Sequence, residues 1–224
     1  SFKNKKILVG SIDKKHYKGT NTFQAHSLFP KFVFQNNIGV DKKLIDFCNQ
    51  QDYIRMESDN GDFSNDYQIL KKLPYFTDET LLRHVRIFLD KGLNLNLHKH
   101  WPEIACSWIV RHGKNDFAHN HWHENSHFSC VYYISQEDNG HIWFENEAKS
   151  NITFPGLKFE YRDDNSFNCN SYKLNVKSGD LIMFPSHLMH NVEKNLKDTY
   201  RYSLAFNIFM KGSFGYNEYQ LEIR

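Results

Sequence analysis

The sequence predicts a mainly β domain with flanking helices, an α+β chain whose core is a sandwich or a small barrel. Aromatic residues make up 16% of the 224 residues, with 19 Phe and 12 Tyr, and this composition favours strands. From about residue 103 the spacing of apolar residues changes from the helical period to the alternation of strands. Because the helical patterns all precede this change, we expect the helices to pack against one face of the β structure.

The first hundred residues contain one expected strand and two expected helices. The segment "SLFPKFVFQ" (Ser27–Gln35) has the composition of a strand that begins near a proline. In "DKKLIDFCNQ" (Asp41–Gln50), apolar residues follow an Asp cap at helical spacing. A longer helix is expected from a cap at Thr77, with Gly92 ending or weakening it. The segment "DNGDFSND" (Asp59–Asp66) between these helices is expected to be a polar loop.

The rest of the chain contains short expected strands separated by turn signals such as "EDNG" and "KSGD". The strands are, in order, "IACSWIVRH", "HFSCVYYIS", "GHIWFEN", "YKLNV", "LIMFP", "HNVEK" and "YRYSLAFNIF". At this length the chain is expected to be one domain. Within it, residues 1–100 would supply the first strand and the supporting helices, 101–212 the β core with the functional site, and 213–224 a C-terminal tail.

The bulk properties argue against several classes of partner. A formal net charge of +2 is too small to favour a nucleic acid or an anionic membrane surface. No apolar run approaches the roughly 20 residues that span a bilayer, and the first residues lack the apolar core of a signal peptide. The four cysteines have no CxxC spacing and are expected to be reduced thiols, so we predict a cytoplasmic location.

Histidine is unusually dense in the stretch "HNHWHENSHFSCVYY" (residues 119–133). His119, His121 and His123 follow one another at i+2, a spacing that places side chains about 6.5–7 Å apart on one side of a strand. Two of them can therefore converge on one metal ion, with His190 as the candidate third ligand. Three ligands on one face of an octahedron leave positions open for substrate or oxygen, as non-haem iron chemistry requires. Other histidines are not expected to be ligands: His112, His127, His141 and His187.

A candidate residue for binding an anion, Arg201, lies eleven residues after His190. Arg201, Ser203 and Asn207 share one face of the expected strand "YRYSLAFNIF". An Arg that points into a β core is costly unless it meets an anion, and a guanidinium can donate two parallel hydrogen bonds to a carboxylate. The alternative is a structural ion pair with an acidic side chain.

Together these segments resemble the 2-oxoglutarate and Fe(II)-dependent oxygenases, and most closely their bacterial and phage branch. That branch carries an HxH pair, then an "SxxxSGVYY"-type strand, "GdLvlFPSWLxHxV" and "RxSxaFN". The matching segments here are "HWHENSHFSCVYYI", "SGDLIMFPSHLMHNV" and "YRYSLAFNIF", within roughly residues 104 to 210. The combination is specific, although each piece alone is not.

The resemblance implies a double-stranded β-helix, also called a jelly roll or cupin-like fold. By position, it makes His121, His123 and His190 the ligands of Fe(II) at the catalytic centre. The family usually has His-x-Asp where this chain has His-x-His, so either His123 replaces the carboxylate, or Glu124 or an outside carboxylate completes the site. Three imidazoles leave more positive charge on the metal, and Zn(II), Ni(II) or Cu(II) could compete. A register that uses His119 and His121 stays open.

For the co-substrate, the resemblance makes Arg201, with Ser203 beside it, the partner of the far carboxylate of 2-oxoglutarate. Tyr132 and Asn207 are further candidates for this site, although alternation puts Tyr132 and Tyr133 on opposite faces of their strand. The implied reaction is a hydroxylation, in which 2-oxoglutarate and O2 are consumed and succinate and CO2 are released.

Two rival functions stay open at this point. A cupin-type three-histidine dioxygenase would share the histidines without using 2-oxoglutarate, and it would not need Arg201 buried beside the metal. A metal- or ligand-binding β-barrel would have no turnover at all. The sequence leaves the organic or protein substrate unidentified and leaves a homodimer open through the early segment. Its Lys- and Asn-rich composition fits a phage or bacterial source.

Overall fold

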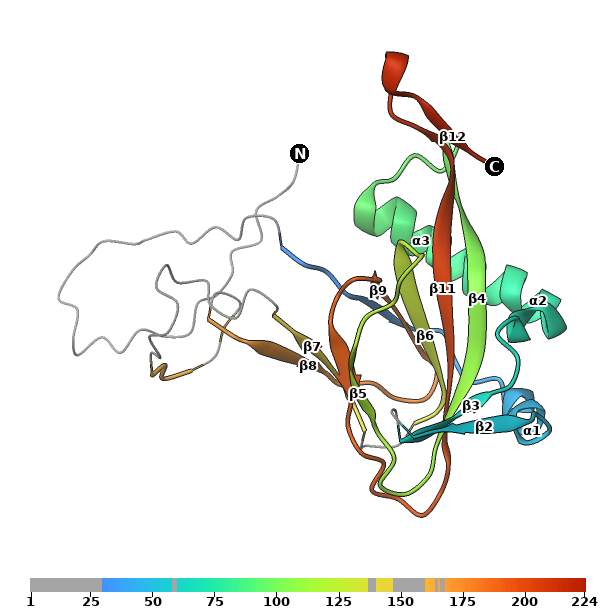
Figure 1. Cartoon of the computed structure of the whole chain (residues 1–224), viewed down its shortest axis with the longest axis vertical. Coiled ribbons are helices and arrows are strands. Elements are labelled where there is room, and N and C mark those ends of the chain that lie inside the picture. Colours follow the sequence, from blue (N-terminus) through green and yellow to red (C-terminus); the bar gives the residue numbers. More distant parts are fainter. Residues whose placement is uncertain (1–29, 58–59, 137–139, 147–159, 164, 166–167) are drawn as a thin grey trace. The chain divides into compact units, whose positions relative to one another are not determined.

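The computed structural model describes residues 30–57, 60–136, 140–146, 160–163, 165 and 168–224 (Figure 1). The chain divides into two compact units, one of residues 1–31 and 146–170 and one of residues 32–145 and 171–224. The described helices and strands all belong to the second unit, which also carries every histidine and arginine of the candidate site. The expected strand Ser27–Gln35 begins outside the described residues, and a strand is observed slightly later, at Phe34–Asn37.

Two antiparallel sheets build this second unit. The large sheet has the order β1 (Phe34–Asn37), β9 (Asp180–Pro185), β6 (Phe128–Ser135), β11 (Arg201–Phe214), β4 (His100–His112), β3 (Gly61–Ser64) and β2 (Tyr53–Met56), with β12 (Leu221–Ile223) paired to the end of β11. The small sheet has the order β5 (Ala118–His121), β10 (His190–Val192), β7 (Ile142–Glu145) and β8 (Ser171–Leu174). The two sheets form a jelly-roll arrangement without a closed barrel (Figure 1).

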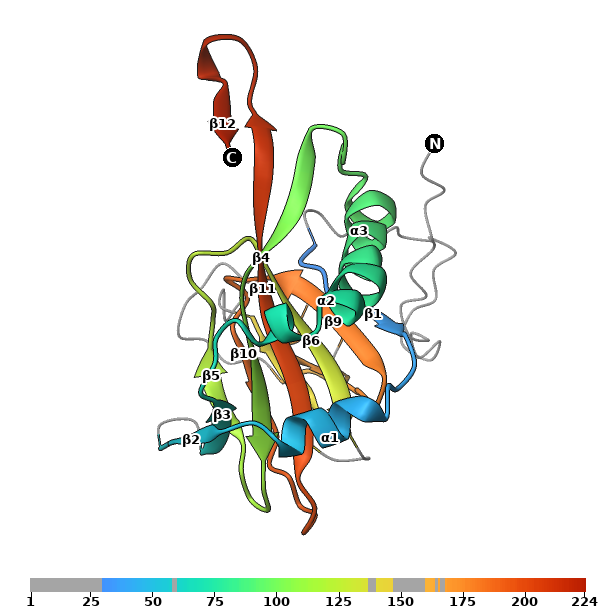
Figure 2. The same cartoon turned by 90° about the vertical axis from the view of Figure 1, so that its right-hand side faces the viewer.

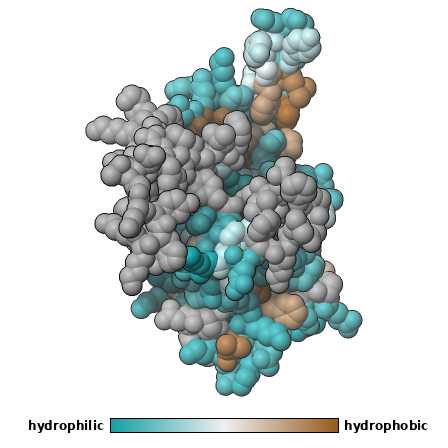
Figure 3. Space-filling view, turned by 90° about the vertical axis from the view of Figure 1, so that its left-hand side faces the viewer, coloured by the Kyte–Doolittle hydropathy of each residue, from teal (hydrophilic) through white to brown (hydrophobic). Residues whose placement is uncertain are grey.

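The helices cover one face of the large sheet, as the sequence predicts (Figure 2). They are α1 (Lys43–Asn49), a short 3₁₀ turn η1 (Ile69–Lys72), and a long helical segment made of α2 (Pro74–Phe76), η2 (Thr77–Leu82), α3 (Arg83–Ile87) and η3 (Phe88–Gly92). A second 3₁₀ turn, η4 (Asn217–Tyr219), lies between β11 and β12. No helix among the residues placed here is long and apolar enough to cross a membrane. On the face shown in Figure 3, the coloured residues are mostly hydrophilic, with hydrophobic ones in small separate patches.

Strand alternation separates the buried apolar residues on the two faces of the large sheet. On β6, Tyr132 and Ile134 pack with the helices, whereas Tyr133 packs with the small sheet. On β9 the same division separates Met183 from Phe184. The large sheet is therefore apolar on both faces, which explains the nearly continuous apolar run "LIMFP".

Three expectations about the elements need correction. The long helix begins at Pro74 and not at a Thr77 cap, because proline is well suited to the first helical turn. The expected loop Asp59–Asp66 contains strand β3, in which Asp62 forms ion pairs with Arg55 and Arg111 of neighbouring strands. The expected tail 213–224 includes the end of β11 and folds back as β12.

Candidate active site

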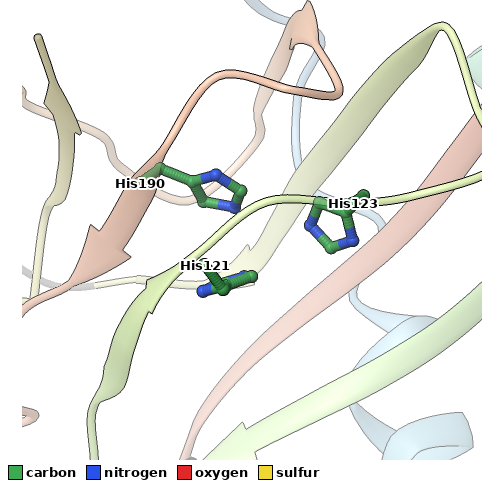
Figure 4. Close-up of side chains that lie close together, drawn as sticks. All are labelled: His121, His123 and His190. Carbon is green, nitrogen blue, oxygen red and sulfur yellow. The ribbon is translucent and has the colours of Figure 1, made fainter. Parts of the chain in front are cut away.

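Three histidines meet where the small sheet borders the interior (Figure 4). His121 ends β5, His190 begins β10, and the two residues are direct cross-strand partners. His123 lies two residues beyond β5. One nitrogen from each ring lies within 4.8 Å of the others, and the ring centroids are 4.2 Å apart for His121 and His190 and 5.2 Å apart for the other two pairs. Three imidazoles at these distances can hold one ion.

Backbone carbonyls fix the orientation of two of these rings. The Nδ1 of His121 lies 2.8 Å from the carbonyl oxygen of His119, and the Nδ1 of His190 lies 2.9 Å from that of Leu188. Since a carbonyl can only accept, each Nδ1 carries the proton and each Nε2 keeps its lone pair. Histidine ligands of metal sites are commonly oriented in this way.

The third ring is positioned through the backbone of the loop after β5. The backbone N–H of His123 donates to the carbonyl of Ser186, at 2.9 Å. The Ser186 hydroxyl lies 2.8 Å from that of Ser126 and 3.0 Å from that of Ser129. Ser129 in turn donates to the side-chain oxygen of Asn207, at 2.8 Å. These buried polar contacts tie the histidine loop to the end of β9 and to β11.

Burial keeps the imidazoles in the form that binds metals. Burial, reinforced by the neighbouring His121, lowers the pKa of His123 to about 4. The same two causes hold the pKa of His190 well below its usual value. Neutral imidazole is the ligand form of histidine, so these rings need not lose a proton to bind an ion at neutral pH.

A cavity of about 260 Å³ adjoins the three histidines and is lined by residues of both sheets. Three rows of paired residues on β4 and β11 form one wall: Trp108 with Ala205, Val110 with Ser203, and His112 with Arg201. The Trp108 ring is 5.6 Å from the ring of His123, which places this row at the histidine end. Four residues along β4, or about 13 Å, separate it from the Arg201 row.

Arg201 is buried at the far end of this wall, with 6% of its surface exposed. Its Nη2 donates to the Nδ1 of His112 at 3.0 Å and to the carbonyl of Glu193 at 3.2 Å. Burial lowers the pKa of Arg201 to about 10, so the side chain is still charged at neutral pH. No ion pair among the described residues includes Arg201, which removes the support for a structural ion pair within that part of the chain.

Several buried polar atoms that line the cavity have no hydrogen-bond partner among the described residues. Leaving such an atom unpaired costs about 1–3 kcal/mol, and native proteins rarely gather several in one place. A ligand with acceptor atoms would satisfy this set, all of which can donate. The atoms are Trp108 Nε1, His112 Nε2, Tyr133 Oη and Arg201 Nη1.

Residues 106–207 match the model of a protein family described as "Putative 2OG-Fe(II) oxygenase". The match covers 102 of the 224 residues, just under half of the chain, and makes this part of it similar to the 2OG-Fe(II) oxygenases. The description of that family names iron(II) and 2-oxoglutarate, the cofactor and co-substrate that the motif predicts. No curated protein matches the sequence significantly.

Solved structures of oxygenases share this fold. A 2OG-Fe(II) oxygenase family oxidoreductase from Burkholderia pseudomallei is similar with a TM-score of 0.53 and 12% identity, over 75% of this chain and 76% of that one. HygX from Streptomyces hygroscopicus, solved with nickel, 2-oxoglutarate and hygromycin B, has a TM-score of 0.53 and 12% identity, over 80% and 83%. The epimerase SnoN, solved with Fe3+, alpha ketoglutarate and nogalamycin RO, has a TM-score of 0.54 and 11% identity, over 81% of both chains. At such identity these similarities show the fold alone, and they confirm the jelly-roll prediction.

The structure brings most of the expected site residues together. His121, His123 and His190 form the only group of three potential ligands found in the part of the chain that the structure describes. His119 lines the cavity without joining this group, and Glu124 is exposed outside it. Of the histidines not expected to be ligands, His127, His141 and His187 also lie outside the group and the cavity.

Two expected co-substrate residues lie outside the cavity lining. The Tyr132 hydroxyl donates to the carbonyl of Gly39 on the helix-covered face, so Tyr133 takes its place at the cavity. Asn207 is absent from the cavity lining and forms part of the buried polar chain with Ser129. This chain of contacts connects Asn207 to Ser186, whose carbonyl accepts from the backbone of His123.

Sequence reasoning missed His112, which lines the cavity beside Arg201. A signal was present, because Trp108, Val110 and His112 alternate on one face of β4. What the sequence could not show is that this face meets Arg201, 89 residues later in the chain.

Proposed function

We propose that this chain is an Fe(II)- and 2-oxoglutarate-dependent hydroxylase, with His121, His123 and His190 as the metal ligands and Arg201 as the partner of the far carboxylate of 2-oxoglutarate. The observation that carries the proposal is the buried, charged Arg201 in the same cavity as the three histidines. Its Nη1 has no partner among the described residues. An anion whose other end binds a metal could contact Arg201 at one end of the cavity and a metal held by the three histidines at the other.

The residues present fit the proposed metal and co-substrate. His121 and His190 offer Nε2 lone pairs from rings fixed by carbonyls, and burial keeps His123 neutral. Three neutral ligands leave both positive charges of Fe(II) uncompensated, which suits a dianion such as 2-oxoglutarate. At the other end, Arg201 would bind the second carboxylate, with Ser203 and Tyr133 beside it on the cavity wall.

Each part of the chain has a separate task in the proposed reaction. When bound, Fe(II) and 2-oxoglutarate supply the oxidising chemistry, in which O2 is consumed, succinate and CO2 are released and the substrate gains a hydroxyl group. The three histidines would hold the metal. Arg201 fixes the direction of the co-substrate, and the apolar wall of Val110, Val131 and Ile142 keeps water out.

The rival is a three-histidine dioxygenase that does not use 2-oxoglutarate. One observation favours it, because the ligand group among the described residues contains no carboxylate. Such an enzyme would leave the buried charge of Arg201 without an anion, at a considerable desolvation cost. We therefore rank it second.

Calorimetric titration of the purified chain separates the two functions. Metal-loaded protein should bind 2-oxoglutarate, the Arg201→Met variant should bind it at least ten-fold more weakly, and both should hold the metal equally well. The exposed His187→Ala variant serves as the control. Succinate release with Fe(II) and O2, and a product heavier by one oxygen atom once a substrate is found, would support hydroxylation. Tight metal binding without any 2-oxoglutarate binding would contradict the proposal and favour the rival.

A further inference from the structure

The contact between His112 and Arg201 determines the protonation of the histidine. The Nη2 of Arg201 lies 3.0 Å from the Nδ1 of His112. A guanidinium has only donors, so this Nδ1 must be the acceptor and carries no proton. The single proton of the neutral ring is then on Nε2. The tautomer follows from the chemistry of the partner, since arginine cannot accept.

The surroundings of His112 keep the ring uncharged. Only 3% of its surface is exposed, and burial, followed by the positive charge of Arg201, lowers its pKa to about 3. Its Nε2 is buried and has no partner among the described residues, although the residue lines the cavity. His112 therefore presents an unsatisfied N–H in the same row of the wall as Arg201.

We propose that His112 is a second, uncharged donor to the far carboxylate of 2-oxoglutarate, and that its Nδ1 holds the guanidinium of Arg201 in the orientation that binds this carboxylate. The inference rests on the proposed function, because it takes the carboxylate at Arg201 as given. It adds a specificity-determining residue. The two donors, one charged and one neutral, would select 2-oxo acids with a second carboxylate against those without one.

The competing explanation is that His112 only accepts a hydrogen bond and fills space beneath Arg201. Both explanations predict some loss of affinity when the ring is changed, since Arg201 would lose a partner. A ligand that lacks the far carboxylate shows whether the loss is confined to the Arg201 end of the cavity. The two explanations differ in what happens when the donor is kept and the ring is removed.

The test compares two ligands on Zn(II)-loaded protein by calorimetric titration, a measurement that needs no turnover. 2-Oxoglutarate carries the far carboxylate, and 2-oxobutyrate has the same keto-acid end without it. In the wild-type chain 2-oxoglutarate should bind much more tightly. His112→Phe should weaken 2-oxoglutarate about 10- to 100-fold and change 2-oxobutyrate by no more than about two-fold, as expected for one lost hydrogen bond to a charged group.

Two further variants make the outcome decisive. His112→Gln keeps an N–H near the position of Nε2 and should recover most of the preference for 2-oxoglutarate. His84→Phe, on the distant helix α3, is the matched control and should change neither affinity. If the wild type fails to prefer 2-oxoglutarate, the proposed function itself is contradicted. If it does prefer 2-oxoglutarate, and His112→Phe keeps that preference or His112→Gln loses it as fully as His112→Phe, the donor role of His112 is overturned while the proposed function stands.

Discussion

Replacing Gly140 by alanine should disable the anion end of the cavity while leaving the fold intact. A Cβ atom added at Gly140 would lie 1.2 Å from the Nη1 of Arg201 and 2.5 Å from its Cζ. Side-chain carbons essentially never approach other atoms closer than 3.0 Å, so the guanidinium would have to retreat by about 2 Å. A hydrogen bond of ordinary length does not survive such a shift.

The expected loss can be separated from backbone strain by a matched control. Gly140 has a φ of +69°, and alanine in that region costs about 1–2 kcal/mol. Gly39 has a φ of +84° with no atom within 4 Å of an added Cβ, so Gly39→Ala carries the strain without the overlap. Because the guanidinium ends a flexible side chain, both variants should lose similar amounts of free energy of unfolding.

Affinity for 2-oxoglutarate should distinguish the two variants sharply. Each hydrogen bond to a charged group contributes about 1.5–3 kcal/mol, so Gly140→Ala should raise the Kd at least ten-fold and Gly39→Ala should leave it unchanged. Urea unfolding gives the stabilities, and calorimetric titration of metal-loaded protein gives the Kd. Equal 2-oxoglutarate affinity in both variants would refute the placement of the anion at Arg201.

Three further predictions concern the histidines and the polar contacts that hold them. His190→Ala should abolish stoichiometric binding of Fe(II) or Zn(II), measured by metal analysis after dialysis, whereas exposed His187→Ala should not. Ser186→Ala removes contacts to the buried hydroxyl of Ser129 and the partly buried hydroxyl of Ser126 and should lower the free energy of unfolding by about 1–2 kcal/mol; an unchanged urea midpoint would contradict this. The pKa of His112 is about 3 when folded against 6.5 for the free side chain, so the unfolded chain binds the proton first and stability should fall as the pH drops from about 6.5 towards 3. His112→Phe should show a flatter pH profile of the urea midpoint over that range.

The sequence was most informative where local spacing and motif agreed. The i+2 step from His121 to His123 and the distant His190 predicted a group that the structure does bring together. Strand alternation also predicted the shared face of Arg201 and Ser203. The shared face of Arg201 and Ser203 follows from the two-residue period of a strand, whereas His123 lies two residues beyond β5 in the loop that Ser186 holds.

The sequence failed where a partner far along the chain decides the outcome. Alternation separates Tyr132 from Tyr133 but cannot say which face the helices cover. Strand β3 appeared polar because Asp62 is matched by Arg111, a residue of β4. His112 was missed for the same reason, because its partner Arg201 lies on β11. In each case the pairing of the sheet, and not the local sequence, sets the environment.

The cross-strand pairing of His121 with His190 has a mechanical consequence. Strand β5 has four residues and β10 has three, and ribbons this short are marginal in water. An ion bound between them would cross-link β5 and β10, so that binding the metal and stabilising the small sheet would become one event. We expect amide hydrogens of β5 and β10 to exchange faster in the metal-free chain, while those of the helix-backed strands β6 and β9 stay protected.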